Sequence, residues 1–498
     1  MSGDAEGAGV AGRVAATRGS ARESALRRTG AWVGLLLGAL GAVEVAVVLA
    51  RGGGYYVVVP RLGFMVPVAV AGLVTALAAL EVGGERTNAV VWLGVVTLAA
   101  VGWNICVYSM KFGRQVWTVL VPLSHPAGVD FRDGLYKPAR AFTTVHSGWP
   151  PLSLYLGKPF TLLKLTTGYH LQVLILVGLA LVATALSAHL AMRAVGNGVT
   201  ARAGRPLTTS LVAVVCGLWL LTSYGFFYEI DRGNIDLYAL VFSLLALWLT
   251  VRGTRSPWPA AAALALATGL KLYPAILVVV LLWRYRLRAL VPVAVTTAVV
   301  LLVAGPANLL HSFTTLQALS TSRTAEWWGQ DSATAMMHVL HEHTSWAPSW
   351  VFWPLIAGPC ALWLATVTAV VRRGWSERGA VLLGAACVSM MAIVPPVSND
   401  YKLVLCVLPL AVLATTLATA RREPGTTWVV LFSAASLLLM LLARSTLLVA
   451  ASLQGSKYAL LVVLQVLLLV SLRLGDPAAT GDGRDAAGPP TASRGTSE

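Results

Sequence analysis

Two aspartates three residues apart, Asp130 and Asp133, could serve in catalysis. They lie in a polar stretch, residues 109–165, that interrupts strongly apolar sequence. A carboxylate walled by membrane helices can act as a general base toward a hydroxyl group. Alternatively, both aspartates cap a short helix or pair with the basic residues around them, of which Arg132 is the nearest. The stretch is therefore a candidate catalytic loop with either aspartate as its base.

A second polar group runs from Tyr228 to Asp236, where two apolar segments meet. An Arg232-Gly233-Asn234 turn that opens a membrane helix can present a guanidinium group, a backbone N–H and an amide to an anion. The other interpretation is an ordinary connection in which Asn234 or Asp236 caps the next helix.

Lys271 interrupts an apolar segment and is followed closely by Tyr273 and Pro274. A lysine in mid-membrane costs about 2.5 to 3.5 kcal/mol, so it needs a partner or a function. Snorkelling to the interface is the alternative, but a position near the tip of a helical hairpin is poor for that.

Two later loops add polar residues, one with Trp327, Trp328 and Asp331 and the other with Asn399-Asp400-Tyr401-Lys402. Tryptophans at such positions are typical of interfacial anchors, a role compatible with a platform for a sugar. We expect no metal, because the H-x-x-H-x-H spacing of three histidines has no matching carboxylate motif. These histidines are His338, His341 and His343.

A carboxylate base, an intramembrane cation and an arginine at a helix start indicate one chemistry. A lipid-linked phosphate would leave at the membrane surface, cations would stabilise its charge, and the carboxylate would activate an acceptor hydroxyl. No P-loop, GxGxxG, zinc spacing or GxSxG elbow occurs where a soluble fold could use it. Nucleotide-driven chemistry is thereby disfavoured, and we expect no cofactor.

The elements that must hold these residues are membrane helices. The 498 residues are 57% hydrophobic and only 12% charged, with a mean hydropathy of +0.74, which indicates an all-α integral membrane protein. Runs of roughly 17 to 25 apolar residues predict about 12 full spans. They lie near residues 31–50, 62–81, 88–108, 170–192, 207–225, 235–251, 289–306, 349–371, 379–395, 403–420, 427–443 and 458–472.

Residues 257–283 are broken by Lys271 and Pro274, and basic residues flank them at both ends. We expect a re-entrant or broken hairpin of two half-helices, since a buried proline and an unwound turn are tolerated only inside protein. One long kinked helix is the alternative.

Both termini are predicted to be disordered cytoplasmic tails, residues 1–30 and 475–498, around one polytopic domain of residues 31–474. The excess of 37 Lys and Arg over 21 Asp and Glu indicates cytoplasmic loops and anionic membrane lipid. No soluble domain remains to bind nucleic acid. The basic residues of the candidate loop would lie on the outer face against the usual trend, which indicates an anionic ligand there.

The motifs resemble those of the glycosyltransferases of the C fold and, within them, glycosyltransferase family 87, over about residues 128–410. The matching pieces are Asp130-Phe131 followed by Tyr136, Trp149-Pro150-Pro151 where the family usually has Tyr-Pro-Pro, Arg232-Gly233-Asn234, Lys271-Leu272-Tyr273-Pro274, Gly329-Gln330-Asp331-Ser332 and Pro395-Pro396-Val397-Ser398.

This resemblance implies a multi-pass protein of the bacterial plasma (inner) membrane that serves envelope synthesis. It would transfer mannose or arabinofuranose from a polyprenyl-monophosphate donor to a hydroxyl of a glycolipid or polysaccharide acceptor on the outer face. Asp130 would be the general base, with Asp133 as its rival. The residues expected at the substrates are Arg232, Asn234, Lys271, Tyr273, Trp149, Asp331 and Lys402.

The chain departs from the family where its mannosyltransferases often have Trp-Asp-His-His and this sequence has Asn399-Asp400-Tyr401-Lys402. The donor sugar therefore stays open. Two other classes share these features: a transporter or flippase of lipid-linked sugars, and a structural subunit of an envelope complex. A transporter would favour paired broken helices in related halves, and the sequence has a single interrupted hairpin.

Overall fold

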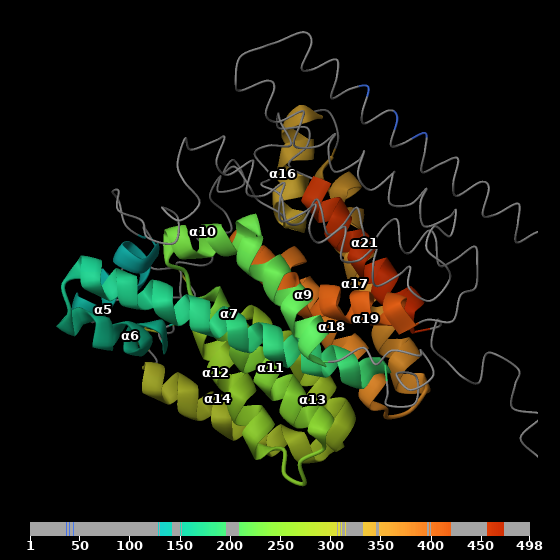
Figure 1. The fold of residues 1–498 in the computed structure, drawn as a ribbon, viewed down its shortest axis with the longest axis horizontal. Coiled ribbons are helices and arrows are strands. Elements are labelled where there is room, and N and C mark those ends of the chain that lie inside the picture. Colours follow the sequence, from blue (N-terminus) through green and yellow to red (C-terminus); the bar gives the residue numbers. More distant parts are fainter. Residues whose placement is uncertain are drawn as a thin grey trace, which may run out of the picture.

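A computed structural model of the chain describes residues 128, 130–141, 150, 152–195, 209–305, 332–344, 348–395, 398, 400–419 and 456–472, with a few isolated positions besides. Every element within these ranges is a helix, and they contain no strand, which confirms the all-α prediction (Figure 1). Four predicted spans fall outside the described residues, as do both predicted tails. Those spans are 31–50, 62–81, 88–108 and 427–443, of which only three single positions are described.

The other eight predicted spans coincide with helices. Each is an apolar run, and a helix satisfies the backbone hydrogen bonds of such a run within the segment itself. These helices are α7 (Leu165–Val195), α9 (Thr209–Thr222), α11 (Asp236–Arg252), α14 (Leu290–Ala304), α17 (Pro354–Arg372), α18 (Glu377–Ile393), α19 (Val407–Thr419) and α21 (Ser456–Ser471).

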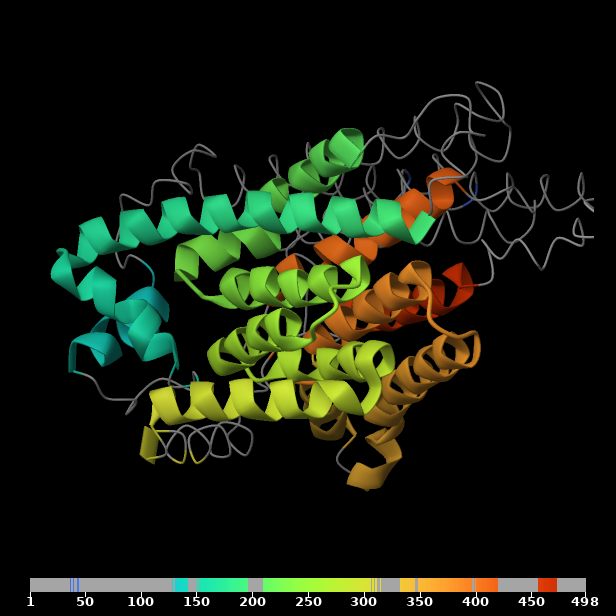
Figure 2. The ribbon, with the colours of Figure 1, turned by 90° about the horizontal axis from the view of Figure 1, so that it is seen from below.

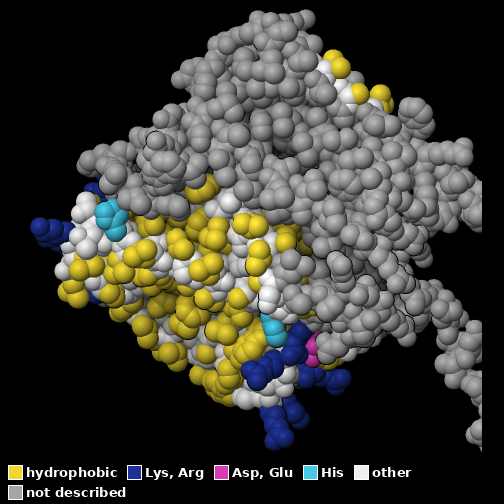
Figure 3. Space-filling view, viewed as in Figure 1, with side chains coloured by type: hydrophobic (Ala, Val, Ile, Leu, Met, Phe, Trp, Pro, Cys, Tyr) yellow, Lys and Arg dark blue, Asp and Glu magenta, His cyan; other side chains and the backbone are white. Residues whose placement is uncertain are grey.

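Three stretches of the described chain are long and apolar enough to cross a membrane: Leu165–Ala194, Tyr273–Val303 and Trp350–Arg372. A fourth would be the bent pair Val212–Thr222 and Gly225–Arg232. In Figure 3, hydrophobic side chains cover the face between two groups of basic side chains. These apolar helices are those of a membrane protein.

The predicted hairpin is present. It consists of α12 (Trp258–Leu270), a break at Lys271, the short η3 (Tyr273–Leu277) and α13 (Val278–Tyr285). The Tyr285 hydroxyl donates to the Thr254 carbonyl at 3.2 Å, so the chain returns to the end from which it entered. A single kinked helix would not bring these residues together.

The chain then turns sharply at η4 (Arg286–Ala289), where Arg286 has a φ of +53°. Beyond this turn α14 runs back along α12, as Figure 2 shows. The apolar stretch Tyr273–Val303 is therefore folded at η4 and is not straight. Its two parts bring the basic residues of η4 to the end of the bundle opposite Lys271.

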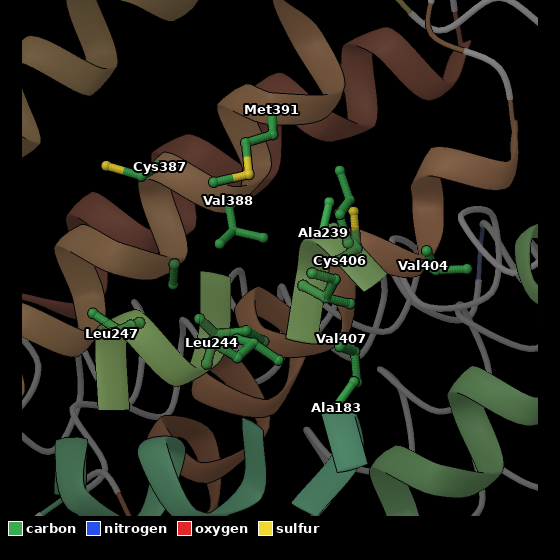
Figure 4. Packing of buried hydrophobic residues seen from close by; sticks show 14 of the residues in the cluster. Ala183, Ala239, Leu244, Leu247, Cys387, Val388, Met391, Val404, Cys406 and Val407 are labelled. Carbon is green, nitrogen blue, oxygen red and sulfur yellow. The ribbon is translucent and has the colours of Figure 1, made fainter. Parts of the chain in front are cut away.

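The core of the bundle is built around α18, whose residues from Gly379 to Ile393 are all buried. Small residues along this helix allow neighbouring backbones to approach closely. An ideal Cβ placed on Gly384 would lie 2.4 Å from a methyl carbon of Leu247 in α11. Figure 4 shows this packing among side chains of α7, α11, α18, η7 (Asp400–Cys406) and α19.

One end of the bundle is covered by short helices from the candidate loop: η1 (Asp130–Tyr136), α5 (Lys137–Ala141), α6 (Leu152–Gly157) and η2 (Lys158–Leu162). They lie beside α10 (Tyr224–Arg232) and the first residues of α11 (Figure 1). Phe131 is fully buried there, with ring centroids 5.4 Å from Phe160 and 5.7 Å from Tyr169. We call this the site end of the bundle.

Candidate active site

Asp130 and Arg232, which are far apart in the sequence, meet at the site end of the bundle. The Arg232 guanidinium donates from Nη2 to Asp130 Oδ1 at 2.5 Å and from Nε to Asp130 Oδ2 at 2.9 Å. The Asp130 side chain is 15% exposed and the Arg232 side chain 29% exposed, so both groups remain accessible. The fork-to-fork geometry is the one in which guanidinium binds carboxylate or phosphate.

Asn234 extends this pair into a larger network. Its Nδ2 donates to Asp130 Oδ2 at 3.2 Å, and its Oδ1 accepts from the Lys271 ammonium at 3.2 Å. Lys271 in turn forms an ion pair with Asp236 at 3.0 Å. The loop, the Arg232-Gly233-Asn234 turn and the hairpin break thus supply one continuous polar chain.

The turn between α10 and α11 is shaped by Gly233, which ends α10 with a φ of +67°. A left-handed residue at this position favours glycine, because a side chain there is strained. An added Cβ would also lie 2.6 Å from Phe131 Cβ. Absence of a side chain therefore lets η1 approach the turn and brings Asp130 within reach of Arg232.

Buried polar side chains of α7 and α10 hold the turn between α10 and α11 in place. The Tyr169 hydroxyl of α7 donates to the Ile230 carbonyl at 2.7 Å, and Gln172 donates to the Asn234 carbonyl at 3.2 Å. Glu229 accepts from the backbone N–H of Leu237 at 3.2 Å, which satisfies a free donor at the start of α11. The alternative that Asn234 or Asp236 caps this helix is wrong: the residue before α11 is Ile235, with no side-chain cap.

Asp133 has different surroundings from Asp130. It accepts from Arg132 Nη2 at 2.7 Å and pairs with Lys137 at 2.9 Å, and its side chain is 39% exposed. The hydrogen bond from Arg132 lowers the pKa of Asp133 to about 2. The alternative of local pairing therefore holds for Asp133, whereas Asp130 pairs with a residue of a distant helix.

An aromatic group borders the network. The Lys402 ammonium lies 5.2 Å from the ring centroid of Tyr273, and the Arg232 guanidinium carbon lies 5.7 Å from that of Tyr228. The rings of Tyr228 and Tyr401 are 5.8 Å apart. Cation–π contacts of this kind hold each of the two cations against a tyrosine ring.

Two predicted substrate residues, Trp149 and Asp331, lie outside the described residues. The part of the chain that the structure describes contains no group of three side chains able to hold a metal ion. Sequence reasoning missed Tyr169 and Gln172, although a glutamine within an apolar helix is a recognisable signal of a buried polar contact.

Chemically, the site places a partly exposed carboxylate against a guanidinium group in a surface made by membrane helices. Such a carboxylate can accept a proton from a hydroxyl, and such a cation can bind a phosphate. For both to act in one reaction, the carboxylate and the guanidinium group must lie within a few ångströms of the bound donor and acceptor.

Residues 149–397, half of the chain, match the model of glycosyltransferase family 87. Comparison with curated proteins found no match, and comparison with solved structures found none either. The matched residues include the Arg232-Gly233-Asn234 turn, the hairpin and α18, while Asp130 precedes them. The chain therefore belongs to glycosyltransferase family 87.

Proposed function

We propose that this glycosyltransferase moves a sugar from a polyprenyl-monophosphate donor to a hydroxyl of a glycolipid or polysaccharide acceptor, with Asp130 as general base. The observation that carries the proposal is the bidentate pair of Asp130 with Arg232. It joins a candidate base and a candidate phosphate ligand in one partly exposed site. Family membership supplies the reaction type, and mannose or arabinofuranose is the proposed sugar.

Arg232 is the proposed ligand of the donor phosphate. Phosphate and carboxylate are both bound bidentately by guanidinium, so the donor would compete with Asp130 for the same fork. Displacement from Arg232 would leave the Asp130 carboxylate free to accept a proton. Binding of the donor would thereby release the Asp130 carboxylate to act as the base.

In the transfer step, the acceptor oxygen forms a bond to the anomeric carbon as the bond from that carbon to the phosphate oxygen breaks. The hydroxyl proton passes to Asp130, and the bonding electrons leave with the polyprenyl phosphate. Attack from the face opposite the leaving group inverts the anomeric configuration. Arg232 stabilises the charge that develops on the phosphate.

Further substrate contacts remain proposals. Lys402 and Tyr273 are two of these proposed contacts, and the Lys402 ammonium lies 5.2 Å from the ring centroid of Tyr273. Trp149 and Asp331 would contribute from the adjoining loops. We also propose that the reaction takes place at the outer face of a bacterial plasma membrane.

The proposed base is tested with two matched variants, Asp130→Asn and Asp133→Asn, purified and assayed for transfer from synthetic polyprenyl-phosphate sugars. Loss of a general base should lower kcat by about 10²- to 10⁴-fold for Asp130→Asn, with little change for Asp133→Asn. If only Asp133→Asn were inactive, Asp133 would be the base. Absence of transfer by wild type with mannosyl and arabinofuranosyl donors, together with movement of such lipids across vesicles, would favour a transporter.

A further inference from the structure

We infer that Asp236 and Lys271 are positioning residues, which act on the proposed base through Asn234, and that Lys271 does not itself bind the donor phosphate. The inference rests on the proposed role of Asp130. It assigns to Asp236 a function, and it replaces the phosphate contact that the sequence predicts for Lys271.

The contacts form an ordered series. Asp236 holds the Lys271 ammonium at 3.0 Å, the ammonium donates to Asn234 Oδ1 at 3.2 Å, and Asn234 Nδ2 donates to Asp130 at 3.2 Å. Three of the residues come from separate segments: Asp236 from the start of α11, Lys271 from the hairpin break and Asp130 from η1. A shift at Asp236 is thus transmitted to Asp130 with no direct contact between the two.

The orientation of the Asn234 amide depends on Lys271. Oδ1 accepts both from the ammonium and from the backbone N–H of Ile235, at 2.7 Å. Both partners are donors only, so a flipped amide would point its NH₂ group at two donors and its oxygen at the Asp130 carboxylate. Lys271 therefore fixes the rotamer that directs an N–H toward the base.

The two cations of the site, Lys271 and Arg232, differ in how deeply they are buried. The Lys271 side chain is 11% exposed and its partner Asp236 is fully buried, whereas the Arg232 side chain is 29% exposed. A phosphate at Lys271 would meet an ammonium that is already bound to Asp236 and Asn234, and it would lie close to the fully buried Asp236 carboxylate. Drawing the ammonium away from a fully buried carboxylate is costly, so phosphate binding is less favourable at Lys271 than at the more exposed Arg232.

A second buried acid, Glu229, fixes the start of α11, the segment that carries Asp236. Glu229 is fully buried and lies close enough to Asp236 and Lys271 to interact with both electrostatically. Its Oε1 accepts from the Leu237 N–H, which leaves it fixed at the start of α11. The fully buried Asp236 carboxylate beside Lys271 holds the ammonium in place and opposes the approach of an anionic ligand.

The test combines turnover with binding of polyprenyl monophosphate, measured separately. The variants are Lys271→Met, Asn234→Leu, the two combined, and the charge-neutral pair Asp236→Asn with Lys271→Met, which avoids an unpaired buried carboxylate. We expect each to lower kcat roughly tenfold to a hundredfold with a nearly unchanged donor KM, because a slightly misplaced base slows only the chemical step. Arg232→Met serves as the control that loses polyprenyl phosphate binding.

The double-mutant cycle supplies the decisive readout. If Lys271 acts through Asn234, the combined variant should be little slower than either single variant, because both remove the same contact to Asp130. Multiplicative effects on kcat, or a loss of polyprenyl phosphate binding by Lys271→Met comparable to that of Arg232→Met, would overturn the inference. These outcomes require an active wild type that depends on Asp130, so they differ from failure of the proposed function itself.

Discussion

Asp130 and Asp133 show how neighbouring groups give two carboxylates of one short helix different properties. Asp133 is paired with Arg132 and Lys137 of the same segment, and its side chain is 39% exposed. Asp130 has a guanidinium group and an amide from the turn between α10 and α11. The first arrangement belongs to the surface of the loop, and the second belongs to a surface that several helices share.

The pairing of Asp133 gives a prediction for stability. Its pKa of about 2 is depressed from an ordinary value near 4, so its contribution is present above pH 4 and is lost as the pH falls toward 2. Because the pair is exposed, Asp133→Asn should lower the free energy of unfolding at pH 7 by about 0.2 to 1 kcal/mol. Thermal unfolding in detergent would measure this, and a difference that persisted at pH 2 would contradict it.

Single residues of the site were predictable, but their contacts were not. The sequence marks Asp130, Arg232, Asn234 and Lys271 as polar residues where apolar residues predominate. The hydrogen bonds between them cross large sequence separations and depend on how η1 packs on α7. Asp236 stood in the sequence as a possible helix cap, and only the structure shows it paired with Lys271.

At the scale of elements, the turn between α10 and α11 controls how close the loop can come. The left-handed Gly233 ends α10 and leaves room for Phe131. Phe131 then packs between Phe160 and Tyr169, which fixes η1 against α7. The position of the candidate base therefore depends on backbone geometry as much as on its hydrogen bonds.

Gly233→Ala should reduce both stability and transfer. A left-handed alanine costs about 1 to 2 kcal/mol, and the added methyl group would also push Phe131 and η1 away from Arg232. Gly374→Ala is the matched control, because Gly374 has a φ of +77° but no neighbouring atom within 4 Å of an added Cβ. Kinetics and thermal unfolding of both variants would test this; equal losses of activity would contradict the role given to Gly233.

Tyr169→Phe should weaken the support of α10 by α7. The change removes the hydrogen bond to the Ile230 carbonyl, which contributes about 0.5 to 1.5 kcal/mol, and should lower kcat as well. Tyr458→Phe removes a similar bond, to the Leu355 carbonyl, from another part of the bundle. We expect it to affect unfolding without lowering kcat, and an equal fall in kcat would argue against a specific link from Tyr169 to the site.

Long apolar helices were the most predictable elements. The expected span at 379–395 corresponds to α18, and the expected hairpin at 257–283 corresponds to α12, η3 and α13. The π-helical η1 was not predicted, since a short segment that contains Gly134 has no hydrophobic period to reveal it. It forms because burial of Phe131 and Leu135 holds the segment against the bundle.

At the scale of the whole molecule, the described helices are held together by close packing around α18. Lipid provides no hydrophobic force between helices, so their association depends on contact and on buried polar groups. Gln465 of α21 supplies one such group, with a hydrogen bond of 2.9 Å to the Ala386 carbonyl. The site end is thus mounted on a tightly packed scaffold.

Gly384→Ala should destabilise this scaffold. The added methyl group would meet fully buried Leu247 at 2.4 Å, and overpacking of this kind costs about 1 to 3 kcal/mol. Gly178→Ala is the control: Gly178 lies within α7, and an added Cβ meets nothing within 4 Å. Thermal unfolding in detergent should show a loss for the first variant and none for the second, whereas a stable Gly384→Ala protein would show that α11 and α18 can separate at little cost.

The contact between Thr254 and Tyr285 also has a consequence for how the chain enters its membrane during synthesis. Since the segment between them leaves and rejoins the same side, it adds nothing to the alternation of inside and outside that orients the later helices. Compartment reporters fused after Gly253 and after Arg288 should therefore report the same side. Lys271, which joins Asp236 to Asn234 in the candidate site, would therefore be inserted by a segment that does not change the orientation of the later helices.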